Sequence, residues 1–325
     1  MTGTSAIPLD KTQQRLGPIW LSAGVTRRNA LTIFYSSAMA VGFINLLNLI
    51  QPLLLQDQLG MTEGEGSFTA TLYVVLELIT LTLAAPLANL SDVVGRRPIF
   101  TTGFIIICLA LLILPTAESG FELGLFRAIA SVGIVSCTTM VASITADYPQ
   151  NATRGKFISA SGICTAIGVI VIGSGLTQLP RVFAGMGYSS VEATSFTLWI
   201  GSVLALITAG ITWSGIRKGR ITTTTEQPGF LNNARTGLRA IGNNRRLMLG
   251  CGATLMSRGD LTVLATFFAL WVQKVGADQS IESVVASATS GRLFGLMQIC
   301  MLLTLPVMGI LADRINRVSV VAVAM

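Results

Sequence analysis

Four ionisable side chains interrupt otherwise apolar runs of this sequence: Glu77, Arg127, Arg258 and Asp260. A charged group at the centre of a lipid bilayer costs roughly 2.5 kcal/mol or more, so each of the four is a candidate functional residue. A carboxyl group that is withdrawn from water can bind and release a proton, which makes Glu77 or Asp260 a candidate site for proton coupling. The alternative for all four is a structural role, as a fixed ion pair or hydrogen bond.

Positions along the runs indicate partners for these charges. Glu77 is ten residues beyond Ser67, or about 15 Å along a helix that begins there, close to the middle of a bilayer. We expect it to pair with Arg127 of a neighbouring helix. Arg258 and Asp260 are two residues apart and point to different sides of one helix, so at least one must face another helix or a wet cavity.

Three amide side chains form a polar stripe at a spacing of three residues: Asn45, Asn48 and Gln51. That spacing keeps them near one face of a helix, where they could contact a small solute or, equally well, hydrogen-bond a neighbouring helix. The five cysteines lie singly in apolar runs and the chain has no histidine, so we expect neither a metal site nor a cofactor.

Long apolar runs must position these residues. Hydrophobic residues make up 51% of the 325-residue chain and charged residues only 11%, less than half of the roughly 25% usual for soluble domains. A bilayer-spanning helix needs about 20 mostly apolar residues, and several runs meet that length without a charge. The sequence therefore predicts an all-α membrane protein with helices at Leu31–Leu55, Ser67–Leu90, Pro98–Leu114, Glu122–Ala146, Gly155–Leu179, Ser195–Ile216, Leu247–Trp271 and Ser290–Ala312, and a ninth run from Val318.

The polar segments divide these spans into parts. We expect a cytoplasmic tail over residues 1–28, a six-helix bundle over 29–216 and a cytoplasmic central loop over 217–246. Residues 247–325 would form a partial second bundle, made of two helices and the start of a third.

Basic residues indicate the orientation of the spans. Seventeen lysines and arginines fall on the side of the amino-terminal tail and the central loop, and three fall on the other. Because such residues favour the cytoplasmic side, we expect a cytoplasmic amino terminus, in a bacterial inner membrane. The net charge of +7 is spread over alternate loops rather than gathered in one patch, which argues against nucleic acid as a partner.

A short motif occurs twice, each time after the second helix of a half. The first copy runs from Ala88 through Asp92, Gly95, Arg96 and Arg97; the second runs from Gly309 through Asp313, Arg314, Asn316 and Arg317. It resembles the cytoplasmic loop signature of the major facilitator superfamily, Gly-x-Leu-Ala-Asp-Arg-x-Gly-Arg-Lys, with Ala88 and Val93 as departures. The run from Leu123 through Arg127 to Gly133 is similar to a second motif of that family.

The resemblance implies two six-helix bundles, the second one incomplete here, with helices one and seven beside a central cavity. It implies a gating cluster of Asp92, Gly95, Arg96, Arg97 and Asp147, repeated at Asp313, Arg314 and Arg317. Within this cluster we expect Arg97 to lie within salt-bridge reach of Asp92 or Asp147.

The implied function is secondary active transport of a small solute by alternating access, coupled to protons, by a monomer in the lipid bilayer. No soluble catalytic constellation or nucleotide-binding loop is visible, so we do not expect an enzyme. The alternative is a non-transporting polytopic membrane protein, such as a sensor or a degenerate, partial transporter.

Overall fold

The structure of the protein is a computed structural model that describes residues 14–61, 64–219 and 267–314, with side chains up to residue 304, and four isolated positions between 239 and 248. Arg258, Asp260 and Arg317 lie outside the described residues. Asp313 and Arg314 are described only as the last residues of a helix.

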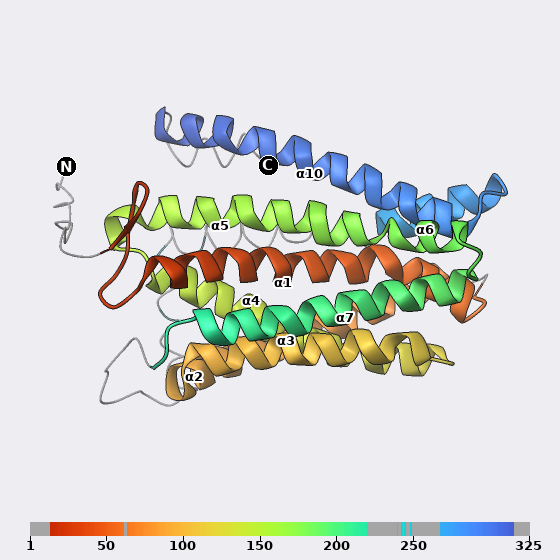
Figure 1. The fold of residues 1–325 in the computed structure, drawn as a ribbon, viewed down its shortest axis with the longest axis horizontal. Coiled ribbons are helices and arrows are strands. Elements are labelled where there is room, and N and C mark those ends of the chain that lie inside the picture. The colour runs from red at the N-terminus through yellow and green to blue at the C-terminus, as the bar shows by residue number, and fades with distance from the viewer. Residues whose placement is uncertain are drawn as a thin grey trace.

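Long helices make up the described fold, and they run side by side along the long axis of the molecule (Figure 1). The helices are α1 (Arg27–Leu53), α2 (Glu65–Val94), α3 (Arg96–Ile113), α4 (Gly120–Asp147), α5 (Arg154–Gly168), α6 (Leu179–Gly185), α7 (Ser190–Gly215) and α10 (Ser283–Arg314). π-Helical turns continue α1 over Leu54–Gln58 and α5 over Val169–Ser174, and 3-10 turns occupy Leu114–Thr116 and Asn151–Thr153. Residues 267–278 are also helical.

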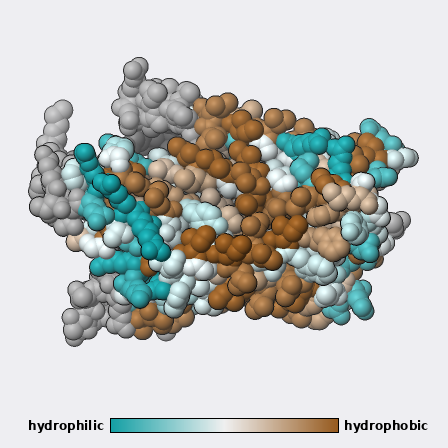
Figure 2. Space-filling model, in the orientation of Figure 1, coloured by the Kyte–Doolittle hydropathy of each residue, from teal (hydrophilic) through white to brown (hydrophobic). Residues whose placement is uncertain are grey.

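Seven of the described helical segments are long and apolar enough to cross a membrane. Apolar residues gather around the middle of the molecule and hydrophilic residues toward its two ends (Figure 2). The prediction of an all-α membrane protein is confirmed, and the chain is an integral membrane protein.

Local sequence explains where several helices begin. The Thr26 and Ser189 side chains cap α1 and α7 by accepting the main-chain N–H of the residue three positions later, Asn29 and Glu192. The side chains of Asn29 and Glu192 in turn accept the main-chain N–H of the capping residue. Between α2 and α3 the chain turns in a single residue, Gly95, at a φ of 104° that only glycine adopts without strain. We call the end of the molecule with this turn the Gly95 end and the opposite end, where α1 stops, the Asp57 end.

Helix α1 occupies the centre of the bundle. Within the most apolar stretch of each span, 78% of residues are buried for α1 but only 11% for α2. Close approach of α5 depends on Gly168, where an added Cβ would overlap the main chain of Ala38. Small residues at such crossings let helices in a membrane pack by van der Waals contact.

The segment before α1 is folded against the Gly95 end. Strands β1 (Arg15–Leu16) and β2 (Ile19–Trp20) pair as an antiparallel hairpin. Ser22 N–H then donates to the carbonyl of Tyr148 at 2.8 Å, and Gln150 N–H donates to the carbonyl of Trp20 at 2.9 Å. The sequence suggested a cytoplasmic tail over residues 1–28; within that segment, Trp20 and Ser22 bond through their main chain to the α4–α5 connection.

Candidate functional site

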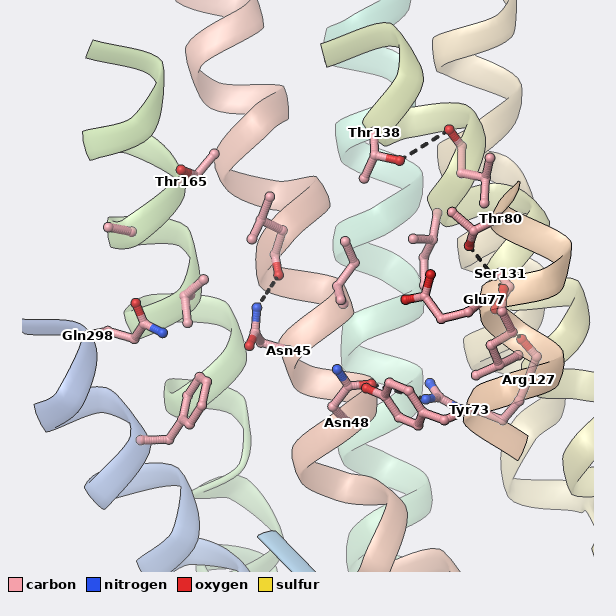
Figure 3. A pocket seen from close by; sticks show the side chains of 18 of the residues that line it. Asn45, Asn48, Tyr73, Glu77, Thr80, Arg127, Ser131, Thr138, Thr165 and Gln298 are labelled. Carbon is pink, nitrogen blue, oxygen red and sulfur yellow. Dashed lines mark hydrogen bonds between the residues drawn. The ribbon is translucent and has the colours of Figure 1, made fainter. Parts of the chain in front are cut away.

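A cavity of about 490 Å³ lies where α1, α2, α4 and α5 meet α10, which belongs to the second half of the chain. Its wall is mainly apolar, with side chains such as Ile44, Leu76 and Phe294. Six of the polar side chains that line it are Asn45, Asn48, Tyr73, Glu77, Arg127 and Gln298 (Figure 3). A mainly apolar pocket with a few placed polar groups is the usual form of a small-molecule site.

Arg127 is the buried charge of this cavity. Its side chain is only 2% exposed, and its Nη2 donates to Oδ1 of Asn48 on α1 at 3.1 Å. Its Nε is buried and has no hydrogen-bond partner. Tyr73 of α2 lies beside the guanidinium group, so three helices meet around it (Figure 3).

The expected ion pair between Glu77 and Arg127 is wrong. Both residues line the cavity, but the ion pairs among the described residues all involve Arg96. Arg127 bonds to the amide on α1, whereas Glu77 stays exposed in the cavity. As expected from the sequence, both charges lie close to one cavity. They form no ion pair because of how α2 and α4 are rotated about their axes.

The polar stripe on α1 divides between two environments. Asn45 and Asn48 line the cavity, and Asn45 Nδ2 donates to the carbonyl of Val41 at 2.9 Å. Gln51 is not in the cavity wall: it is 2% exposed, and its Nε2 donates to Oγ1 of Thr69 on α2 at 3.4 Å. Each step of three residues falls about 60° short of a full turn, so the stripe drifts away from the cavity.

A charge cluster lies at the Gly95 end. Its arginine is Arg96, whereas we expected Arg97 to pair with the acids. Arg96 Nη2 lies 3.2 Å from Oδ1 of Asp92 and 2.7 Å from Oδ2 of Asp147, so it joins α3 to α2 and α4. Arg97 does not pair with either acid, and its guanidinium carbon lies 4.0 Å from the ring centroid of Trp213 on α7. Neighbouring residues in a helix point about 100° apart, so only one of two adjacent arginines can face α4.

Beside this cluster, Tyr148 joins the end of α4 to the start of the central loop. Its side chain is 1% exposed, and its hydroxyl accepts the main-chain N–H of Arg217 at 3.2 Å. Burial raises the pKa of the phenol to about 12, so the hydroxyl remains neutral at physiological pH.

At the Asp57 end, α10 is fastened to the amino-terminal bundle by side chains that the sequence analysis did not select. Oδ2 of Asp57 accepts hydrogen bonds from Ser190 of α7 and, at 2.5 Å, from Ser283 of α10. Gln178 accepts from Nε of Arg292 at 2.9 Å and donates to the carbonyl of Ala288 at 2.8 Å. We call these contacts the Asp57 clamp.

One other lining residue could have been found from sequence. Tyr73 precedes Glu77 by four residues, and residues four apart share a helix face. Nothing local marks Asp57 or Gln178, because their partners on α10 are distant in the sequence.

The fold defines a polytopic helical membrane protein with a cavity between its amino-terminal helices and α10. The chain belongs to the Major Facilitator Superfamily, whose sequence profile it matches over residues 33–325. Members of this family are membrane transporters rather than enzymes.

Similar proteins support this assignment. The chain is 26% identical to the magnetosome protein MamH of Paramagnetospirillum magneticum over 93% of its own length and 68% of that protein. It is 24% identical to the magnetosome protein MamZ of Magnetospirillum gryphiswaldense, over 85% of this chain but only 43% of that one. It therefore spans about two thirds of the first of these relatives and less than half of the second.

Solved structures share the fold. A bacterial homologue of the human lysosomal transporter Spinster superposes with a TM-score of 0.64 at 16% identity, over 90% of this chain and 64% of that one. The nucleoside transporter NupG superposes with a TM-score of 0.66 at 14% identity, over 88% of this chain and 68% of that one.

Proposed function

We propose that the protein is a secondary active transporter that moves a small solute by alternating access and couples this movement to protons. The observation that carries the proposal is the cavity of about 490 Å³ between the amino-terminal bundle and α10, with a titratable carboxylate, Glu77, in its wall. A site between two halves can be exposed to either side of a membrane when the halves rock against each other.

The distribution of contacts supports this scheme. Among the residues whose side chains the structure describes, which end at residue 304 in α10, hydrogen bonds between the bundle and α10 lie at the Asp57 end, in the Asp57 clamp. Toward its carboxyl end, α10 diverges from α5 (Figure 1). We assign the Gly95 end to the cytoplasm from the basic loops, so in this proposal the Asp57 clamp closes the outer side of the site.

Glu77 is the candidate proton carrier among the described residues. It lines the cavity, is exposed there and makes no ion pair with the Arg127 of the same site. Asp260, the other candidate, lies outside the described residues. A carboxylate that faces the solute can pick up a proton on one side of the membrane and lose it on the other.

Transport by the purified protein in proteoliposomes tests the proposal. Labelled small solutes would be offered with and without an imposed pH gradient of either sign. We expect at least one solute to accumulate above its outside concentration only with a gradient, and a protonophore to abolish the accumulation. Identical, unsaturable fluxes in protein-containing and empty vesicles would reject transport, and gradient-independent accumulation would reject proton coupling.

A further inference from the structure

The cavity contains a buried cation whose hydrogen-bonding capacity is not used up. A guanidinium group carries five N–H donors. Nη2 of Arg127 donates to Oδ1 of Asn48 at 3.1 Å, and its buried Nε has no hydrogen-bond partner. A buried charged donor without an acceptor costs more than an ordinary missing hydrogen bond, so a ligand that supplies the acceptor gains correspondingly.

No acceptor among the described residues bonds to Nε of Arg127. The ion pairs among the described residues are those of Arg96, at the Gly95 end, and Glu77 does not reach the guanidinium group. Asn48 provides an amide oxygen, which is neutral. Most of the remaining wall is apolar, which strengthens the interaction of the cation with any anion that enters.

The geometry of the group selects the kind of ligand. Nε–H and Nη–H of an arginine form a planar fork that matches two oxygens of one carboxylate or phosphate group. Both Arg127 and Asn48 line the cavity, and Nη2 of Arg127 bonds to Asn48, so an anion that bonds to the guanidinium group would also lie within reach of the Asn48 amide (Figure 3).

We propose that Arg127 and Asn48 form the binding subsite for an oxyanion, a carboxylate or phosphate group carried by the small solute. This inference rests on the proposed function, because the cavity is taken as the solute site. With the anion on Arg127, the proton on Glu77 would travel with it, and the pair would cross the membrane with less net charge.

Ligand-induced thermal stabilisation of the purified protein tests the subsite without requiring transport. The probes are succinate, lactate and inorganic phosphate, each acid being compared at equal concentration and ionic strength with its amide, succinamide or lactamide. A ligand that binds the folded state raises the unfolding temperature in a saturable way. We expect saturable stabilisation by at least one oxyanion and none by the matching amide; equal stabilisation by acid and amide, or none by any oxyanion, would overturn the proposal.

Variants then assign the effect to the residue. Arg127→Gln should weaken binding of that oxyanion at least about tenfold, and Arg127→Lys should lose less, since it keeps the charge but not the fork. The matched control is Arg181→Gln, because Arg181 is exposed on α6 and does not line the cavity. A purely structural Arg127 would lower the unfolding temperature of the ligand-free protein and leave the ligand-induced shift unchanged, and this result would also overturn the proposal.

The acid–amide comparison on the unaltered protein decides the matter even if the variants do not fold. Carboxylates and phosphate are separate arms, so their relative half-saturating concentrations identify the preferred group. Proton-driven uptake without oxyanion binding would reject this subsite and leave the proposed function standing. Saturable, Arg127-dependent binding without any flux in proteoliposomes would support this subsite and reject the proposed transport function.

Discussion

Nη2 of Arg127 on α4 and Oδ1 of Asn48 on α1 are 3.1 Å apart, and this hydrogen bond ties the buried charge of the cavity to the central helix. A sequence separation of 79 residues lies between them. The contact fixes the guanidinium group against α1 and leaves Glu77, in the wall of the same cavity, without a basic partner among the described residues.

Glu77→Gln should separate coupling from solute movement. The amide keeps the size and hydrogen bonding of the side chain but cannot titrate. If Glu77 carries the proton, the variant loses gradient-driven accumulation in proteoliposomes but retains solute exchange, which needs no net proton release. Asp260→Asn is the parallel variant, and a structural acid would instead change folded yield or nothing. Full accumulation by the double variant would contradict both assignments.

Arg96 and Arg97 should differ in their effect on the Gly95 end. Arg96→Gln removes the contacts to Asp92 and Asp147 and should lower the free energy of unfolding by about 1 kcal/mol, since the cluster is partly exposed. Arg97→Gln, the matched variant, removes only the contact with Trp213. Asp147→Asn should cost less in the Arg96→Gln background than in the unaltered protein, because the contact between the two side chains is already lost there. Thermal unfolding in detergent measures this, and additive losses would contradict the pairing.

Two serines on Asp57 allow the Asp57 clamp to be tested. Ser283→Ala breaks only the bond to α10, whereas Ser190→Ala breaks only the bond within the amino-terminal bundle. We expect Ser283→Ala to loosen the Asp57 end and to increase labelling of a cysteine at Thr138, in the cavity wall, from that side. Ser190→Ala is the control for losing one serine hydroxyl. Equal labelling of the two variants would argue against a gate at this position.

Gly168→Ala should weaken the packing of α5 on α1. The new Cβ would overlap the main chain of Ala38, and forcing the helices apart typically costs about 1–3 kcal/mol. Gly210→Ala is the control, because nothing lies within 4 Å of a Cβ at that position. It should be neutral or slightly stabilising, since alanine favours a helix over glycine. Unfolding temperatures of the two variants in the same detergent test the difference.

Cysteine labelling should establish the orientation. In a background without the five native cysteines, Lys218→Cys, at the central loop, should react only with a reagent supplied to the cytoplasm. Gly66→Cys, at the Asp57 end, should react from outside in intact cells; an added Cβ there has nothing within 4 Å. Labelling of both positions from one side would contradict the assigned orientation.

Local sequence determined the class of protein. The length and charge content of apolar runs are properties of contiguous residues, and water and lipid act on them wherever the helices end up. The family resemblance was equally local, because the motif around Asp92 and Gly95 serves one tight turn between consecutive helices. For the same reason the seven spans that the structure describes could be located before their neighbours were known.

Only the tertiary structure decided which side chains meet. Arg96 rather than Arg97 faces Asp147, Gln51 leaves the cavity while Asn48 stays, and Arg127 bonds to Asn48 instead of Glu77. Each outcome depends on how far a helix is rotated about its axis. That rotation is set by packing between helices, such as the close approach of Gly168 to Ala38, and the local sequence of one helix does not show which residues of another helix will face it.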